Sequence, residues 1–527
     1  MAVDVTGSPA EGQRVAAQAS LRQGLGAPRR SRHSCQSSIL RLQHWRSYVP
    51  LLLQTGSVAV SSQPLGCLKA RAAIQCRNGI GGAARGRYLF AAAPVWRCTP
   101  SIGVLSERRR GTHDCKVVEA MTATESVLRN RPSWLGQLFM DAGLAALPWI
   151  FGILRKRKPI LRLGNSYLVT RHDDVREVFA ADDAFGAPYL EKLDVIMGRE
   201  PFILGMTEGA DYRAGLAALR SVVRRADLPL LAIRVEAMAE AIVAAAPGRI
   251  DVVDALVRRV SFGFIGDYLG VAPPVDADLH VWGTRLFEYQ FVADDAPLRA
   301  EVDRIAPALR AHVQSEIVRC RAAPAERDDV IARCLVLQAG GVPGFSDDQI
   351  RTNVVGLLVG GPPQPPMVVP QAMEQLLRRP LALAAAQAAA RADDDVALAA
   401  HLAEAMRFDP LAPWLPRTVL SSRTIGSDRH ARIVPAGAKL LVSIASAMRD
   451  ERHVPEPDRF DAGRTPDQYI HFGHGLHQCF GMWINQATLH LMLKPLLKRP
   501  NLRRAPGRDG RLRKHGAFAS TLIVAFD

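Results

Sequence analysis

A ten-residue stretch, Phe472 to Gly481, restricts the possible folds more than any other part of the 527-residue chain. It reads Phe-Gly-His-Gly-Leu-His-Gln-Cys-Phe-Gly, and an apolar run with helical spacing follows from Met482 to Leu497. Cys479 therefore lies in a glycine-rich loop just before a predicted helix. The free N–H groups and partial positive charge of a helix start favour a thiolate, and glycines let a large flat group approach the backbone. A thiolate presented in this way is a suitable ligand for iron.

These residues resemble the haem-binding loop of the cytochrome P-450 family, whose pattern is Phe-x-x-Gly-x-His/Arg-x-Cys-x-Gly. The specified positions are all filled, by Phe472, Gly475, His477, Cys479 and Gly481. An isolated cysteine in a glycine-rich turn is more often a small buried hydrophobe, but the complete pattern favours a ligand. The resemblance implies a haem b cofactor, with Cys479 on the iron, His477 on a haem propionate and Phe472 packed beside the thiolate.

The resemblance covers residues 121–527 and implies a mainly α-helical single domain with small β-sheets. Composition agrees with a globular protein, because 48% of the chain is hydrophobic and 22% is charged. Two extended runs between Ile160 and Thr170 flank a Gly164-Asn165 turn and predict a β-hairpin. A capping box from Ser346 to Gln349 predicts the start of a long apolar helix, which corresponds to the central helix of the family.

Residues 1–120 differ in charge from the rest of the chain. They carry 17 Lys and Arg against 5 Asp and Glu, which gives +12 of the total net charge of +16. Because the remaining residues are nearly balanced, the basic charge does not predict a nucleic-acid-binding domain. A transit peptide, a disordered extension and upstream sequence translated from an early start codon all fit this composition. We favour the last interpretation, with a natural start at Met121.

The early apolar runs do not fit a membrane span, since residues 49–53 are too few and the short run of residues 138–154 includes Asp141 and Pro148. Cysteines are sparse after residue 120, where only Cys320, Cys334 and Cys479 occur, and no Cys-x-x-Cys pair exists in the chain. Such usage suits a reducing cytoplasm. We therefore expect a cytoplasmic protein that binds neither membranes nor nucleic acids.

The helix after the capping box carries the largest departure from the family pattern. The family has Ala/Gly-Gly-x-Asp/Glu-Thr-Thr here, whereas residues 360–366 read Gly-Gly-Pro-Pro-Gln-Pro-Pro. Prolines at this density cannot continue a regular helix, so we expect a break beside the haem. The resemblance places Gly361 and Gln364 at the catalytic positions, but Pro363 and Gln364 replace the acid and the alcohol that pass protons. Either another residue relays protons through water or the chemistry itself differs, and the sequence leaves both open.

Glu404 and Arg407 stand at i and i+3 at the end of a predicted helix that begins at Asp393, so their side chains can pair. This spacing alone is weak evidence, but the pair precedes Cys479 by 75 residues, as the family requires. The resemblance then implies that Arg459 completes a buried Glu-Arg-Arg set. It also implies that Arg417 binds a haem propionate, a pairing that guanidinium geometry favours.

Two further assignments stay open. The family usually takes a second propionate contact from a His or Trp and an Arg four residues later, but Asp211 and Gly215 stand at those positions. The candidates to replace that pair are Tyr212, Arg213 and Arg220. Basic residues that follow the cysteine loop can dock an acidic redox partner, although solvated surface charge is the simpler interpretation. These residues are Lys494, Lys498 and Arg499.

The resemblance implies a haem-thiolate monooxygenase that oxidises a small apolar organic substrate with dioxygen, taking electrons from ferredoxin and ferredoxin reductase. Because the acid and threonine are replaced by Pro363 and Gln364, a peroxide-using peroxygenase or a hydroperoxide isomerase is an alternative. A non-catalytic haem protein that binds a ligand is a third possibility. The substrate itself does not follow from the sequence.

Overall fold

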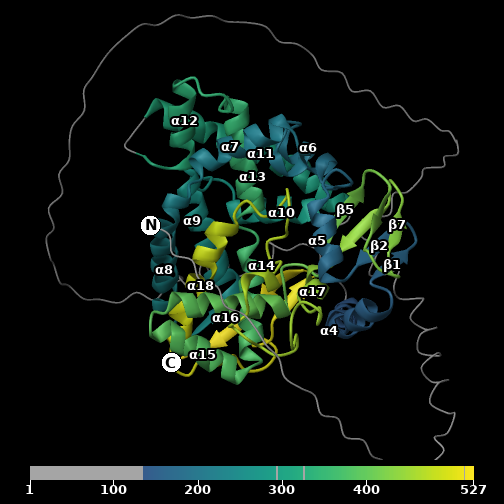
Figure 1. Ribbon diagram of the computed structural model, residues 1–527. Coiled ribbons are helices and arrows are strands. Elements are labelled where there is room, and N and C mark those ends of the chain that lie inside the picture. Colours follow the sequence, from purple (N-terminus) through teal and green to yellow (C-terminus); the bar gives the residue numbers. More distant parts are fainter. Residues whose placement is uncertain (1–133, 292–294, 324–326, 516) are drawn as a thin grey trace, which may run out of the picture. The chain divides into compact units, whose positions relative to one another are not determined.

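The structure, a computed structural model, describes residues 134–291, 295–323, 327–515 and 517–527. These residues form a mainly helical fold with small β-sheets, as predicted (Figure 1). The interpretation of residues 1–120 and the boundary at residue 121 lie outside the described residues. Within the described ranges, no helix combines the length and the apolar character needed to cross a bilayer.

Helices make up most of the fold. In chain order they are α4 (Trp134–Arg157), α5 (His172–Ala180), α6 (Leu190–Met197), α7 (Ala210–Val222), α8 (Leu228–Ala244), α9 (Arg259–Leu269), α10 (Leu279–Phe291), α11 (Ala296–Ala322), α12 (Val330–Ala339), α13 (Asp347–Gly360), α14 (Pro365–Leu377), α15 (Pro380–Arg391), α16 (Asp395–Phe408), α17 (Ile444–Ala447) and α18 (Met482–Lys498). The helix predicted after Cys479 is therefore present as α18 and begins at the expected residue.

The strands form small separate sheets. They are β1 (Ile160–Leu163), β2 (Ser166–Val169), β3 (Phe185–Gly186), β4 (Arg249–Asp251), β5 (Leu415–Val419), β6 (Arg423–Ile425), β7 (Arg432–Val434), β8 (Lys439–Val442), β9 (Arg503–Arg504), β10 (Arg513–His515), β11 (Phe518–Thr521) and β12 (Ile523–Ala525). The largest sheet has the order β1-β2-β8-β5-β3, and the others are β4-β12-β9, β10-β11 and β6-β7.

The predicted hairpin forms one edge of the largest sheet. Strands β1 and β2 pair antiparallel with Ile160 opposite Val169, and Gly164 in the turn has a left-handed φ of 63°. Strand β2 runs parallel to β8, and β8 runs antiparallel to β5 with Leu440 opposite Arg417. The sheet thus fixes the backbone of Arg417 between two strands, which positions this residue for the site described below.

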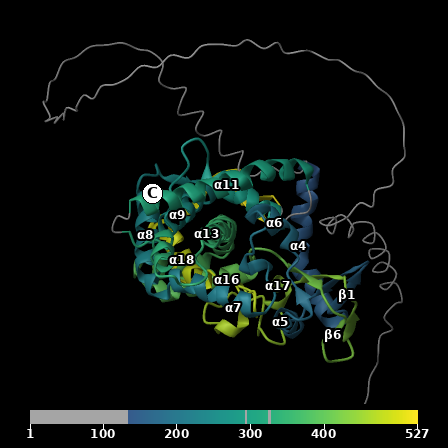
Figure 2. The ribbon, with the colours of Figure 1, turned by 90° about the horizontal axis from the view of Figure 1, so that it is seen from above.

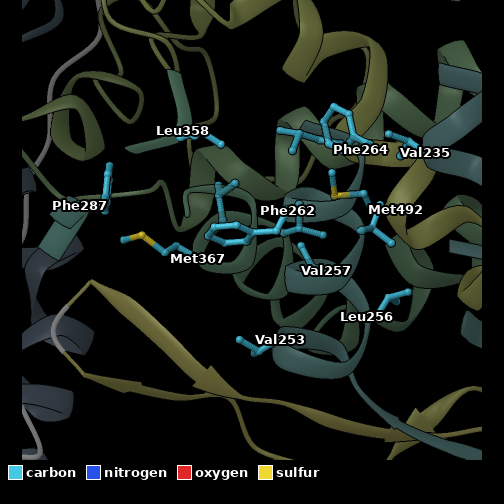
Figure 3. Close-up of a cluster of buried hydrophobic side chains, with 14 of the residues drawn as sticks. Val235, Val253, Leu256, Val257, Phe262, Phe264, Phe287, Leu358, Met367 and Met492 are labelled. Carbon is cyan, nitrogen blue, oxygen red and sulfur yellow. The ribbon is translucent and has the colours of Figure 1, made fainter. Parts of the chain in front are cut away.

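The main hydrophobic core lies among the helices, with α13 in its middle. Helix α13 contacts α6, α9, α10, α11 and α12, and Figure 2 shows it nearly end-on between α6, α9 and α11. Figure 3 shows Phe262 of α9 in this core. Val257, from the helical turn before α9, and Met367, from α14, lie close to it. These three side chains are almost completely buried. Burial of such apolar surface is the main favourable contribution to folding.

The predicted break in the central helix is present. Helix α13 starts with the expected capping box, in which Ser346 and Gln349 each accept a hydrogen bond from the other's backbone N–H (3.3 and 3.0 Å). It ends at Gly360, and α14 begins at Pro365. Pro365 and Pro366 occupy the first turn of α14, where a backbone N–H has no helical partner in any case. These prolines therefore end one helix and start the next.

Candidate active site

The cysteine loop folds back on itself before α18 begins. The N–H of Cys479 donates to the carbonyl of Phe472 (2.8 Å), and the N–H of Met482 donates to the carbonyl of Cys479 (3.2 Å). Gly475 has a φ of 75°, and a Cβ atom there would lie 2.0 Å from the carbonyl oxygen of Phe179 in α5. Both the backbone conformation and the lack of space therefore require glycine at position 475.

Burial dominates the electrostatics of the thiol. It raises the pKa of Cys479 to about 11, although a hydrogen bond from the backbone of Gly481 acts in the opposite direction. The hydrogen bond from Gly481 therefore favours the thiolate but is too weak to produce it in the chain alone. Coordination to a metal ion deprotonates a thiol outright. Cys479 is half-buried, and a metal ion that binds beside it would both deprotonate the thiol and cover it.

Of the candidates on the helix after residue 210, Tyr212 is the one that contacts the cysteine loop. Its hydroxyl donates to the carbonyl of Leu476 (2.7 Å), and its ring lies edge-on to that of His477 with 6.2 Å between centroids. Arg213 pairs with a neighbouring glutamate at the surface, and Arg220 is exposed. Helix α7 thus supports the loop through a phenol.

Arg417 is a buried cation without an acidic partner. Arg417 lies on strand β5 and is 5% exposed. Its Nη1 donates to the carbonyl of Pro416 (2.9 Å). Its Nε has no hydrogen-bond partner among the described residues, and none of their carboxylates forms an ion pair with it. Burial lowers its pKa, with Tyr189 and Asp182 acting weakly in the other direction. A buried charge without an ion-pair partner destabilises the fold, so an anion bound beside Arg417 would be stabilising.

His477 completes this polar group. Burial, followed by the charge of Arg417, lowers the pKa of His477 to about 4. His477 is therefore a neutral imidazole near the guanidinium of Arg417. A neutral imidazole can donate one hydrogen bond to a carboxylate without adding a second positive charge.

These features fit the haem that the sequence predicts. Cys479 offers a soft sulfur ligand, Arg417 lacks a carboxylate, and haem brings both an iron and carboxylate groups. A Cβ atom on Gly360, at the end of α13, would meet no atom within 4 Å. The end of the central helix therefore borders open space rather than packed side chains.

The break after α13 leaves backbone carbonyls that a regular helix would satisfy. Pro365 and Pro366 have no N–H, so the carbonyls of Gly361 and Pro362, four residues earlier, lose their helical donors. The N–H of Gln364 donates to the carbonyl of Gly361 (3.2 Å) and serves the first of these groups. The second needs a donor from elsewhere in the chain.

Ser261 of α9 provides that donor. Its hydroxyl, which is fully buried, donates to the carbonyl of Pro362 (2.9 Å). On the other side of the break, the side-chain amide of Gln364 donates to the carbonyl of Gly360. Gln364 therefore acts here as a hydrogen-bond donor at the helix end, and an amide has no readily ionised proton. Positions 363 and 364 thus carry a proline and an amide instead of the family's acid and alcohol, and the amide caps the end of α13.

A small apolar cluster joins the central helix to the cysteine loop. Its buried members come from α7 and the turn before it, and α13 and the loop pack against them. They are Ile203, Tyr212 and Leu219, with Leu357, Leu476 and Phe480 around them. The two regions that the sequence singles out are therefore connected through α7.

Glu404 is the centre of a buried ionic network. Arg407 donates to both of its oxygens (2.8 Å each), as predicted, and both side chains have no exposed surface. The N–H of Asp461 (2.9 Å), the hydroxyl of Tyr469 (3.2 Å) and Nε of Arg464 (3.2 Å) donate to the same carboxylate. This network ties α16 to the segment that leads into the cysteine loop.

The prediction that Arg459 completes this set is wrong. The Arg459 side chain is 63% exposed and pairs with Glu456 (2.9 Å) across a turn in which the N–H of Arg459 donates to the carbonyl of Glu456. Arg464, at 4% exposure, takes the predicted place. Arg459 contributes only its backbone carbonyl, which accepts from both Arg407 and Arg464. The turn points the Arg459 side chain to solvent, which explains the exchange.

The proposed basic docking residues are already paired. Lys494 is buried and contacts three carboxylates, those of Glu236 (2.9 Å), Asp393 (3.1 Å) and Asp395 (2.8 Å). Lys498 also pairs with Asp393, and Arg499 with a glutamate of α8. The expectation that these residues receive an acidic partner is therefore not supported, because their charge is neutralised within the fold.

Sequence reasoning missed several supporting residues. Asp182 accepts a hydrogen bond from the N–H of Leu476 (3.3 Å), and burial raises its pKa. Ser261 and Arg464 were also not anticipated. Ser261 lies in an ordinary apolar helix, so no local pattern marks it. Arg464 could have been considered from the sequence, because it lies five residues after Arg459, the arginine that was predicted for the same role.

Comparison with known proteins gives one consistent result. The family described as "Cytochrome P450" matches residues 295–522. The chain is 26% identical over 370 residues to erythromycin C-12 hydroxylase from Saccharopolyspora erythraea, which covers 67% of this chain and 87% of the relative. It is 28% identical over 391 residues to mycinamicin IV hydroxylase/epoxidase from Micromonospora griseorubida, with 69% and 91% covered.

Solved structures show the same fold. The ligand-free structure of cytochrome P450 TbtJ1 matches with a TM-score of 0.61 at 24% identity and covers 73% of this chain and 98% of that one. At this identity the likeness concerns the fold, whereas the cysteine loop described above concerns the site.

Proposed function

We propose that this chain is a haem-thiolate monooxygenase of the cytochrome P450 family, which inserts one oxygen atom from dioxygen into a small apolar organic substrate. The observation that carries this proposal is the half-buried Cys479 in its glycine-rich loop at the start of α18. The names of the relatives, a hydroxylase and a hydroxylase/epoxidase, support monooxygenation over peroxide-driven chemistry and over a non-catalytic role.

The haem iron belongs to the family's chemistry, and we propose that the cofactor is haem b. Cys479 would hold the iron, Arg417 and His477 would bind the propionates, and Phe472 would pack beside the sulfur. The unpaired, buried guanidinium of Arg417 supports its role. When bound, the haem supplies the redox chemistry that reduces dioxygen and transfers one of its atoms.

The residues of the chain then have three tasks. The cysteine loop holds the ligand sulfur at a fixed place, through the hydrogen bond from Cys479 N–H to Phe472. Gly361 and Gln364 shape the end of α13, where the side-chain amide of Gln364 donates to the carbonyl of Gly360. Neither Pro363 nor Gln364 ionises usefully, so proton delivery in this proposal falls to another residue acting through water.

The remaining assignments follow the same pattern. The named relatives refer to erythromycin and mycinamicin IV, so both are sensible first ligands in a search for this chain's substrate. Electrons would come from a ferredoxin with its reductase. A cytoplasmic location agrees with the free, buried thiols of Cys320 and Cys334.

The experiment compares two oxidants with one substrate. A ligand that shifts the haem absorption spectrum is selected first and is then supplied either with ferredoxin, reductase and dioxygen or with hydrogen peroxide alone. The proposal predicts turnover with the reductase system and one oxygen atom of labelled dioxygen in the product. Turnover with peroxide alone would replace it by a peroxygenase, and spectral shifts without turnover under either condition would indicate a binding protein.

A further inference from the structure

Two histidines from distant parts of the chain stack on each other outside the cysteine site. His172 begins α5 and His453 follows α17, and these two helices pack together (Figure 1). The ring centroids lie 3.6 Å apart with 14° between the planes. Asp173 completes the group, because one ligand atom from each of the three residues lies within 4.8 Å of the other two. We call this group the His-Asp-His cluster.

The His172 imidazole lacks a partner. Its side chain is 1% exposed, and its Nε2 makes no hydrogen bond to any of the described residues. Its Nδ1 lies 3.5 Å from a carboxylate oxygen of Asp173, which is a long contact. A buried polar nitrogen without a partner costs free energy, so the cluster leaves a position for a group that binds nitrogen.

Residues around the cluster already orient it. Nε2 of His453 lies 3.2 Å from the carbonyl oxygen of Asp467 and 3.5 Å from its carboxylate. A proton on this Nε2 leaves the lone pair on Nδ1, and metal-binding histidines are oriented by such contacts. The backbone of His172 is fixed as well, since its N–H donates to the carboxylate of Asp450 (2.9 Å). The backbone of His172 and the ring of His453 are therefore restrained before any ligand arrives. Because the stacked rings direct their in-plane lone pairs nearly parallel to each other, one ring must turn for both histidines to bind the same ion.

One cation stands close by and has another partner. Arg452 lies 3.8 Å from the carboxylate of Asp173 but donates at 2.6 Å to that of Asp450. Its side chain is 44% exposed, so it has room to stay on Asp450 when Asp173 turns to a new ligand. The charge of Arg452 thus does not block the cluster.

We propose that His172, Asp173 and His453 bind a divalent transition-metal ion, with Zn²⁺ as the best match, at a site separate from the haem iron. Two imidazoles and one carboxylate are a common donor set for such ions, with water in the remaining positions. Mg²⁺ and Ca²⁺ prefer oxygen ligands and suit this set poorly. The ion would join residues 172 and 453 and stabilise the packing of α5 on α17.

The test uses the tag-free haem-containing protein after treatment with a chelator. Zn²⁺ is titrated by calorimetry, and the melting temperature is followed with and without the ion. The variants are Asp173→Asn, which alters an exposed side chain, and His453→Gln. The control is His430→Gln, a histidine in the turn between β6 and β7, which an ion pair between Arg171 and Asp428 ties to the start of α5 but which is not part of the cluster. We expect Zn²⁺ to raise the melting temperature, and each cluster variant to weaken binding by about tenfold or more. His430→Gln and the addition of Mg²⁺ should change neither quantity.

Cysteines elsewhere in the chain can also bind Zn²⁺, so the variants decide the matter rather than the stoichiometry. Equal Zn²⁺ affinity in the wild type, Asp173→Asn and His453→Gln proteins would overturn the proposal, as would the absence of any saturable binding to the wild type. In the second case, a water molecule serves the buried nitrogen of His172. Neither outcome depends on turnover by the haem centre.

Discussion

The cysteine loop and the break between α13 and α14 are stabilised in different ways. The segment before the loop is held by a buried carboxylate, Glu404, which accepts hydrogen bonds from two arginines, a tyrosine and a backbone N–H. The break is held by neutral hydrogen bonds from Ser261 and Gln364 to carbonyls that the prolines leave without a helical donor. A buried ionic network therefore fixes the segment before the cysteine loop, whereas neutral hydrogen bonds satisfy the carbonyls at the helix break.

This difference shows what each region has to do. A metal ligand must keep its position to within a fraction of an ångström, and a satisfied ionic network provides such rigidity. The end of α13 instead tolerates unusual residues, provided that the freed carbonyls find donors. Substitutions in the first region should therefore affect folding and haem retention, and those in the second should have smaller effects.

The largest effect is expected for Glu404→Gln. It removes the charge that two buried arginines share and leaves them without an anion, so we expect a loss of about 3–5 kcal/mol in the free energy of unfolding. Denaturant unfolding of the haem-containing protein measures this quantity. The control is Glu456→Gln, an exposed partner of Arg459, which should cost less than about 0.5 kcal/mol. Equal effects would show that the buried carboxylate of Glu404 does not hold the segment before the cysteine loop.

The next prediction separates two arginines that lie close in sequence. Arg464→Ala breaks a buried contact with Glu404, so we expect a loss of about 2 kcal/mol or more and faster loss of haem. Arg459→Ala removes an exposed side chain and should leave stability within about 0.5 kcal/mol of the wild type. Stability curves of the two variants, measured side by side, test the pair. A larger effect of Arg459→Ala would restore the original sequence-based assignment.

Ser261→Ala tests the repair at the helix break. It leaves the buried carbonyl of Pro362 without a donor, so we expect a loss of about 1–3 kcal/mol. The matched control is Ser221→Ala, because that hydroxyl also donates to a carbonyl but at an exposed position. The variant should also alter the spectral shift that a bound substrate causes, since the end of α13 would relax. If Ser261→Ala and Ser221→Ala behave alike, the hydrogen bond to Pro362 does not support the break.

The smallest effect is expected for Arg417→Ala. This change should not destabilise the haem-free protein, but it should weaken the binding of haem. Arg417→Ala removes a buried cation that has no ion-pair partner among the described residues, so the haem-free protein should not lose stability. Denaturant unfolding of the haem-free form measures this. In the haem-containing protein the same change removes the proposed propionate contact, and we expect haem affinity to fall about tenfold, or about 1.4 kcal/mol. Arg417→Lys keeps the charge and should restore part of the affinity. Unchanged haem transfer to apomyoglobin in Arg417→Ala would contradict the role.

The sequence predicted those parts of the site that are local. The cysteine loop, the capping box of Ser346 and Gln349 and the proline break are contiguous patterns, and each is present. The pair of Glu404 and Arg407 follows from helical spacing, which the backbone enforces. These elements depend on short-range geometry, so they could be recognised without a structure.

Contacts between distant segments could not be predicted. The Ser261 hydroxyl and the Pro362 carbonyl are 101 residues apart, and no local pattern links them. Arg459 and Arg464 lie in an irregular segment, where one turn decides which side chain is buried. Lys494 appeared to be a free surface charge in the sequence, but acidic groups from α8 and from the segment that begins α16 surround it. Tertiary packing, rather than residue type, settled each case.

The most direct test of the account is the spectrum of the reduced, carbon monoxide-bound protein. The wild type should show the absorption band of a thiolate-ligated haem, and Cys479→Ala should lose it. Cys320→Ala, which changes another free thiol, should keep it. If the thiolate band persists in Cys479→Ala, the sulfur ligand is another residue, and the central assignment of Cys479 is wrong.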